Sequence, residues 1–110
     1  MKENAILVGY HALDELRELA TTAGARIIDE VIQRRQRPDP ATYIGKGKVE
    51  ELREQVVEEG VDVVIFDDDL SPNQARNLEE ALDTKVVDRT GLILDIFANR
   101  ARTKEGKLQV

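Results

Sequence analysis

The sequence predicts an α/β domain: a small, mostly parallel sheet of four to five strands with helices on both faces, in a Rossmann-like three-layer arrangement. Three observations predict it. Short apolar runs rich in β-branched residues alternate with longer segments whose apolar residues recur at helical spacing. Turn residues close each longer segment, at Gly24, Gly60 and Asp83. Strands that alternate with helices in this way pair in parallel through right-handed crossovers.

The first predicted strand and helix precede Gly24. Residues 5–8 form an uninterrupted apolar run closed by Gly9, which is typical of a central strand buried on both faces. Apolar residues then recur at helical spacing over 13–23. His11, the only histidine, lies in the turn between them, where open α/β folds bind ligands. A purely structural role is the alternative, because no partner side chain that would make it catalytic is apparent.

The second predicted strand covers Ile27 to Ile32, although its apolar spacing would also suit one face of a helix. We choose a strand because β-branched residues dominate and because Pro38 and Pro40 prevent a helix from continuing. We expect its far end, which carries Arg34 and Arg35, to extend past the sheet into solvent.

A basic loop follows this strand in a chain that is otherwise acidic. Gly45 and Gly47 can take positive φ and turn backbone N–H groups toward one point as a helix begins near Lys48, a geometry that binds anions. The alternative is an ordinary surface loop with flexible glycines. The loop is not a Walker A motif, since Thr42 replaces the first glycine and Val49 follows the lysine. We therefore reject phosphoryl transfer here.

A helix over 49–60 and a buried strand over 61–66 come next, and we expect Leu52, Val56 and Val57 to face inward. Carboxylates at 67–69 then suit a Mg²⁺ site or the phosphoacceptor site of a receiver domain. We favour a structural interpretation, in which these acids flank a helix N-terminus. The capping-box residues are Ser71 as N-cap, Pro72 at the first helical position and Gln74.

The last predicted elements are a strand at 85–87 and a helix that starts near Gly91. The residues expected to face inward on this helix are Leu92, Ile93, Ile96 and Phe97. Its far end is basic, through Arg100, Arg102, Lys104 and Lys107. No turn or cap signal follows, so we expect the helix to lead into a further region that is missing here.

Composition limits the function. One domain is expected from 110 residues with 41% hydrophobic content. With no cysteine, no long apolar run and no signal-like start, we expect a cytoplasmic protein without disulfides or a membrane span. A net charge of -6 argues against a nucleic-acid binder that uses its whole surface. Any contact with RNA must therefore be local.

Several long motifs together resemble one family. They are Arg34-Arg35 with the run from Arg37 to Lys48, the run from Phe66 to Pro72, Asn77-Leu78-Glu79, and the run from Asp88 to Ala98. In this order they resemble the N-terminal domain of the HflX GTPases, and the resemblance spans nearly all of residues 1–110. It implies a ribosome-associated translational GTPase that binds the large subunit and rescues or splits stalled ribosomes.

The resemblance also implies what this chain lacks. The family continues into a helical hairpin and then a GTPase domain, both absent here, so we expect no catalytic residue, metal site or cofactor in this chain. GTP and Mg²⁺ are expected in the missing GTPase domain, which would itself be a partner of this one. We therefore expect the chain alone not to be an enzyme.

Two main hypotheses follow. The first is a non-catalytic module that docks on the RNA of the large ribosomal subunit, and its candidate phosphate contacts are Arg34, Arg35, Arg37, Lys46, Lys48, Arg100, Arg102 and Lys104. The second is a separate ATP- or GTP-binding module, with phosphates held by Gly45, Lys46, Gly47 and Lys48 and with His11 or Asp67 near the base or ribose. A receiver-like or Mg²⁺-binding domain is a weaker alternative, because Asp88 and Arg89, rather than a lysine, follow the last strand.

Overall fold

The structure is a computed structural model that describes residues 2–34 and 37–109, with side chains described as far as Asn99. Strands and helices alternate along the chain, as predicted. In order they are β1 (Asn4–Gly9), α1 (Asp14–Thr22), β2 (Arg26–Ile32), α2 (Lys46–Glu59), β3 (Val63–Phe66), α3 (Pro72–Leu82), β4 (Lys85–Asp88) and α4 (Arg89–Gln109).

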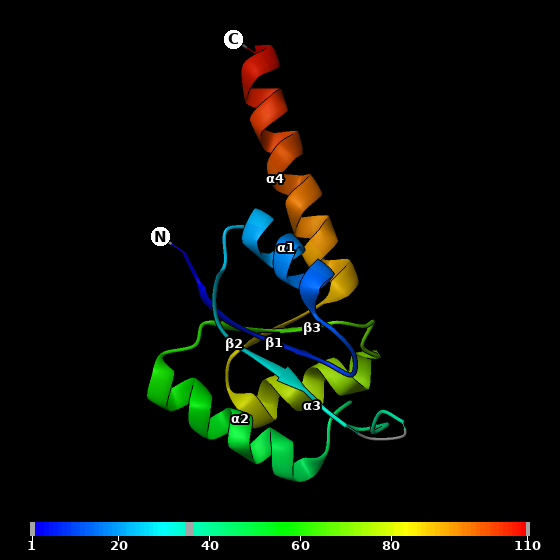
Figure 1. The fold of residues 1–110 in the computed structure, drawn as a ribbon. Coiled ribbons are helices and arrows are strands. Elements are labelled where there is room, and N and C mark those ends of the chain that lie inside the picture. Colours follow the sequence, from blue (N-terminus) through cyan, green and yellow to red (C-terminus); the bar gives the residue numbers. More distant parts are fainter. Residues whose placement is uncertain (1, 35–36, 110) are drawn as a thin grey trace.

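The sheet has the strand order β2-β1-β3-β4, and every pairing is parallel. Helices α1 and α4 cover one face and α2 and α3 cover the other, so the predicted three-layer arrangement is confirmed (Figure 1). Helix α4 extends well beyond the body of the domain (Figure 1). None of the described helices combines the length and the apolar character that crossing a membrane requires.

Strand β1 is central and supplies both hydrophobic cores. Because successive strand residues point to opposite faces, Ile6 and Val8 pack toward α2 and α3, whereas Ala5 and Leu7 pack toward α1 and α4. All four side chains are fully buried. This two-sided burial is why the sequence shows an unbroken apolar run and not an alternating one.

The ambiguous second segment is a strand, and the helical alternative is wrong. Strand β2 lies at an edge of the sheet, so several of its side chains are only half-buried and its pattern is irregular. Arg17 of α1 donates to Glu30 of β2 through two hydrogen bonds, which tie the helix over this edge. Arg34, just beyond the strand, is exposed as predicted.

Two side chains expected to face inward are exposed. Val57 of α2 is 64% exposed and Phe97 of α4 is 61% exposed. Each follows the residue that is buried at that turn, Val56 or Ile96, and a step of one residue rotates a side chain by about 100° around a helix. The helix from residue 46 also begins two positions earlier than expected.

Gly9 provides a test of the packing between the end of β1 and its neighbours. A Cβ added there would lie 2.7 Å from Leu13 Cδ2 and 3.1 Å from Asp67 Cβ. We therefore expect Gly9→Ala to lower the free energy of unfolding by about 1–3 kcal/mol in denaturant melts. Gly47→Ala is the control, because nothing lies within 4 Å of its added Cβ and its helical position favours alanine by up to about 1 kcal/mol. Equal stability of the two variants would contradict this packing.

Candidate functional site

The carboxyl edge of the sheet contains a crevice at the position where the strand order reverses. The chain leaves β1 toward β2 on one side and leaves β3 toward β4 on the other, so the loops after β1 and β3 diverge. A cavity of about 300 Å³ lies there. Its lining residues are Tyr10, His11, Gln33, Arg34, Pro38, Tyr43, Asp67 and Asp68. The structure thus brings together His11, Arg34 and Asp67, which were predicted from separate segments.

An aromatic cluster forms the inner wall of this cavity. Tyr43 makes edge contacts with Tyr10 and Phe66, with ring centroids 5.1 and 5.6 Å apart. The Tyr10 hydroxyl donates to the Tyr43 carbonyl. Tyr43 and Ile44 are 3% and 0% exposed, so a loop expected to be basic and solvated contributes to the core. The sequence signal for this burial is the adjacent aromatic and β-branched pair Tyr43 and Ile44, which the sequence analysis did not use.

The loop before α2 is closed by its own hydrogen bonds and is attached to α3. Asp39 and Tyr43 exchange backbone hydrogen bonds, and Asp39 Oδ1 accepts from the Ala41 and Thr42 N–H groups at 2.7 and 3.1 Å. Gln74 of α3 donates to the Asp39 carbonyl at 2.8 Å, and Asn77 donates to the Ala41 carbonyl at 2.9 Å. This part of the loop is a fixed support for the cations around it.

The expected glycine cradle is absent, and this expectation was wrong. Gly45 is the N-cap of α2 with φ -65° and ψ 155°, and Gly47 lies in the first turn of the helix. Among the described glycines, only Gly24 and Gly60 have positive φ. Because α2 begins at Lys46, Gly45 has extended and Gly47 helical backbone, and the Gly45 N–H is already used by Gln33 Oε1.

The cations that were predicted to bind phosphate do not all lie on one surface. The Gly45 N–H donates to Gln33 Oε1 at 3.0 Å, so Arg34 and Lys46, which follow these residues in the chain, lie at one edge of the domain. Arg37 is exposed in the same loop. Lys46 lines a separate groove between α2 and α3, and Lys48 forms an ion pair with Glu51 at 2.8 Å. The lysines of the predicted phosphate site therefore do not line the cavity that holds His11 and Asp67.

The remaining predicted RNA-binding residues are Arg35, Arg100, Arg102 and Lys104. Arg35 falls outside the described residues. For Arg100, Arg102 and Lys104 the structure describes the backbone and not the side chains. The backbone of α4 carries these last three away from the basic loop. Asn99, which directly precedes them, lines a groove at the opposite, amino edge of the sheet. The backbone at the basic end of α4 therefore lies apart from the basic loop (Figure 1).

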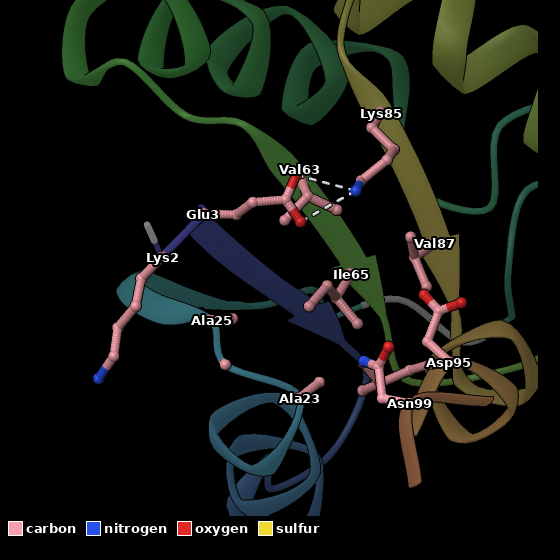
Figure 2. A pocket seen from close by; sticks show the side chains of 12 residues that line it. Lys2, Glu3, Ala23, Ala25, Val63, Ile65, Lys85, Val87, Asp95 and Asn99 are labelled. Carbon is pink, nitrogen blue, oxygen red and sulfur yellow. Dashed lines mark hydrogen bonds and ion pairs between the residues drawn. The ribbon is translucent and has the colours of Figure 1, made fainter. Parts of the chain in front are cut away.

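That groove at the amino edge has a volume of about 530 Å³ (Figure 2). Figure 2 shows its apolar floor of Val63, Ile65 and Val87 and the ion pair between Glu3 and Lys85, which measures 2.8 Å. It contains none of the predicted site residues and lies away from the ends of the strands where α/β folds bind ligands.

The carboxylates after β3 are held by the start of α4. Asp67 pairs with Arg89 at 2.8 Å, and Arg89 also pairs with Glu15 of α1. Asp69 accepts from the Thr90 hydroxyl at 2.5 Å. In these interactions two of the three aspartates bind other side chains of the protein. This favours the structural interpretation, in which the acids flank a helix N-terminus and bind no ligand. No three acidic or histidine side chains within the described parts of the chain are grouped so as to hold a metal ion.

Caps complete this junction. Asp88 accepts from the Leu70 and Gly91 N–H groups at 3.1 and 2.8 Å, so it connects the loop after β3 to the first turn of α4. The predicted capping box is confirmed, with Ser71 and Gln74 each accepting from the other's backbone N–H.

Burial shifts two ionisable groups beside the cavity. It raises the pKa of Asp67, and the neighbouring Asp68 carboxylate adds to this increase while His11 opposes it. Burial and then Asp68 also raise the pKa of Tyr43, whose hydroxyl donates to Asp68 across 3.4 Å. The Tyr43 hydroxyl therefore stays protonated and acts as a donor.

The family model for the GTP-binding GTPase N-terminal domain matches residues 10–98. The chain belongs to the HflX family and corresponds to its N-terminal domain. Three GTPase HflX relatives illustrate the similarity. That of Lacrimispora saccharolytica is 60% identical over 99 residues (90% of this chain), that of Caldanaerobacter subterraneus is 53% identical over 116 (99%), and that of Escherichia coli is 50% identical over 98 (89%). The chain spans only 23–27% of the length of these HflX relatives.

Solved structures show the same fold. SsGBP in complex with GDP superposes with a TM-score of 0.80 at 26% identity, over 99% of this chain and 32% of that one. A GTP-binding protein of Sulfolobus solfataricus in complex with GDP superposes with a TM-score of 0.72 at 24% identity, over 89% of this chain and 30% of that one. The HflX motifs that carried the resemblance thus form the loop on α3, the β3–α3 turn and the β4–α4 junction.

The ion pair between Asp67 and Arg89 supplies a test of this junction. We expect Arg89→Met to lower the free energy of unfolding by about 1–2 kcal/mol at neutral pH, because Asp67, with a side chain only 17% exposed, loses its cation. Without Arg89, the pKa of Asp67 in the folded state rises further. A carboxyl group whose pKa is raised in the folded state stabilises the protein at low pH, where it is protonated, and this stabilisation is lost as the pH increases.

The deficit of Arg89→Met should therefore shrink in acid, as measured by thermal melts of both proteins at neutral and acidic pH. Lys85→Met is the control. It removes the same charge from a pair whose side chains are 50% and 51% exposed, so its effect should be small at both pH values. A deficit of Arg89→Met that is independent of pH would contradict the assigned role of Asp67.

Proposed function

We propose that this HflX-type domain docks on the RNA of the large ribosomal subunit through the carboxyl edge of its sheet during ribosome rescue or splitting. The main support is the placement of charge. In a chain of net charge -6, the exposed Arg34, Arg37 and Lys46 gather around one loop that hydrogen bonds fix on α3. A loop whose backbone is already held in place binds phosphates at a lower ordering cost than a flexible loop does.

In this proposal the chain is a cytoplasmic, non-catalytic part of a translational GTPase. GTP and Mg²⁺ bind in the parent's GTPase domain, outside this chain, and that domain is a partner of this one. The relatives support this division, because they are GTPases of which this chain corresponds to about a quarter. The acidic helices face away from the RNA, since carboxylates repel phosphates.

The charges give a direct test. We expect Arg34→Ala together with Arg37→Ala to weaken binding to purified large subunits and to flatten its salt dependence. The slope of log K against log salt should fall by about 0.7–0.9 for each phosphate that the variant no longer neutralises. The measurement is sedimentation with subunits over a range of salt concentrations. Melting temperature should hardly change, because both arginines are exposed.

Lys2→Ala together with Arg26→Ala is the matched control. This pair removes the same charge from exposed positions at the amino edge of the sheet. We expect it to keep the wild-type slope. Wild-type affinity and slope in the Arg34 and Arg37 variant would show that the basic loop is not the docking surface.

A second candidate function is a nucleotide site, and the cavity at the strand-order reversal favours it. Open α/β sheets bind nucleotides at this position. Arg34 is a candidate phosphate ligand there, and His11 and Asp67 line the same cavity. The lysines at the start of α2 lie outside the cavity, so this version of the hypothesis relies on Arg34 in place of Gly45 to Lys48.

Calorimetric titration of the 110-residue chain with ATP and with GTP tests this second function. A nucleotide site would give saturable one-to-one binding that His11→Ala or Arg34→Ala weakens roughly tenfold, the effect of one charge-assisted hydrogen bond. Lys85→Ala, at the opposite edge of the sheet, should leave it unchanged. Absence of saturable binding would reject the nucleotide site and leave RNA docking in place.

A further inference from the structure

A groove of about 700 Å³ is lined by residues of α2, α3 and the loop before α2. These two helices lie on the face of the sheet opposite α1 and α4 (Figure 1). The apolar part of the groove's lining comes from Ala41 of the loop, Val49 of α2 and Ala81 of α3, and charged residues border this part. Apart from Lys46 at one end, the groove contains none of the residues assigned to RNA or nucleotide binding. A groove of this kind accommodates an apolar side chain of a partner.

The rim of the groove carries two carboxylates of α2 and, beside them, the cations Lys46 and Arg53. Glu50 and Glu54 line it, and both are exposed and lie four positions apart on the same face of α2. Ion pairs described in the structure involve neither of them. The cation between them, Arg53, donates instead to the Leu82 carbonyl at 3.1 Å and pairs with Asp83 at 3.7 Å.

The C-terminal turn of α2 strengthens this negative field. It contains Glu58 and Glu59 and no basic residue, although the helix dipole is already negative at that end. Val57, 64% exposed, lies one turn beyond the groove-lining Arg53 and Glu54 and extends the apolar line along the helix. The surface therefore combines exposed apolar area with carboxylates that are available to a partner.

We propose that this groove binds a segment of a basic protein. An apolar side chain of that segment packs on Val49 and Ala81, and flanking lysine or arginine residues pair with Glu50 and Glu54. Charge complementarity selects this partner. RNA is disfavoured because the rim carboxylates repel phosphates, and a second copy of this chain is disfavoured because both copies carry a net charge of -6.

Fluorescence anisotropy with two labelled peptides tests the proposal. One peptide is an amphipathic sequence of leucine and lysine, and the other replaces each lysine with glutamate. We expect saturable binding of the lysine peptide alone. Glu50→Lys with Glu54→Lys should weaken it about tenfold, as expected for the loss of two exposed ion pairs and their replacement by repulsion. Ala81→Arg, which places a charged side chain on the groove floor, should weaken it by a similar factor.

Asp14→Lys with Glu18→Lys is the control. These are exposed acids at the same spacing on α1, on the other face of the sheet, and binding should change less than about twofold. Circular dichroism checks that each variant is folded. The proposal is overturned if the lysine peptide does not bind, if both acidic pairs matter equally, or if Ala81→Arg binds like the wild type. Displacement of the peptide by single-stranded RNA would also overturn it, because the groove would then belong to the RNA interface.

Discussion

Burial of β1 and β3 on both faces is the constraint on which the rest of this domain depends. Both strands consist almost entirely of apolar side chains, so helices must cover both sides of the sheet. Covering both sides requires the chain to leave the two central strands in opposite directions. The crevice at the carboxyl edge, with His11, Arg34 and Asp67 around it, is a direct consequence of that reversal.

Acidic side chains organise this edge without forming a metal site among the described residues. Asp67, Asp69 and Asp88 each use their oxygens to connect the loop after β3 with the first residues of α4. Arg89 extends the connection to α1 through Glu15. The direction in which α4 leaves the domain is therefore coupled to the loop that borders the crevice, because both depend on the same ion pair and caps.

Charge is segregated by surface, which reconciles an acidic chain with a proposed RNA contact. Arg34 and Arg37 lie around a loop supported by Gln74 and Asn77 of α3, whereas carboxylates on α2 border an apolar groove that has Lys46 at one end. Phosphate attraction acts over roughly a Debye length, about 8–10 Å at physiological salt, so a local basic surface can bind RNA although the net charge is negative. The two surfaces suit partners of opposite charge.

The sequence by itself determined the layers, the position of β1, the capping box at Ser71 and the family, because these depend on periodicity and on local residue types. Tertiary structure alone decided the rest. It placed Tyr43 in the core, gave Gly45 and Gly47 ordinary backbone dihedral angles, and exposed Val57 and Phe97. It also brought His11, Arg34 and Asp67 around one cavity and left Lys46 and Lys48 outside that cavity. The physical reason is the distance along the chain over which each feature is determined. Patterns within one element report on that element, whereas a site assembled from three loops depends on strand order and on contacts between residues far apart in the chain.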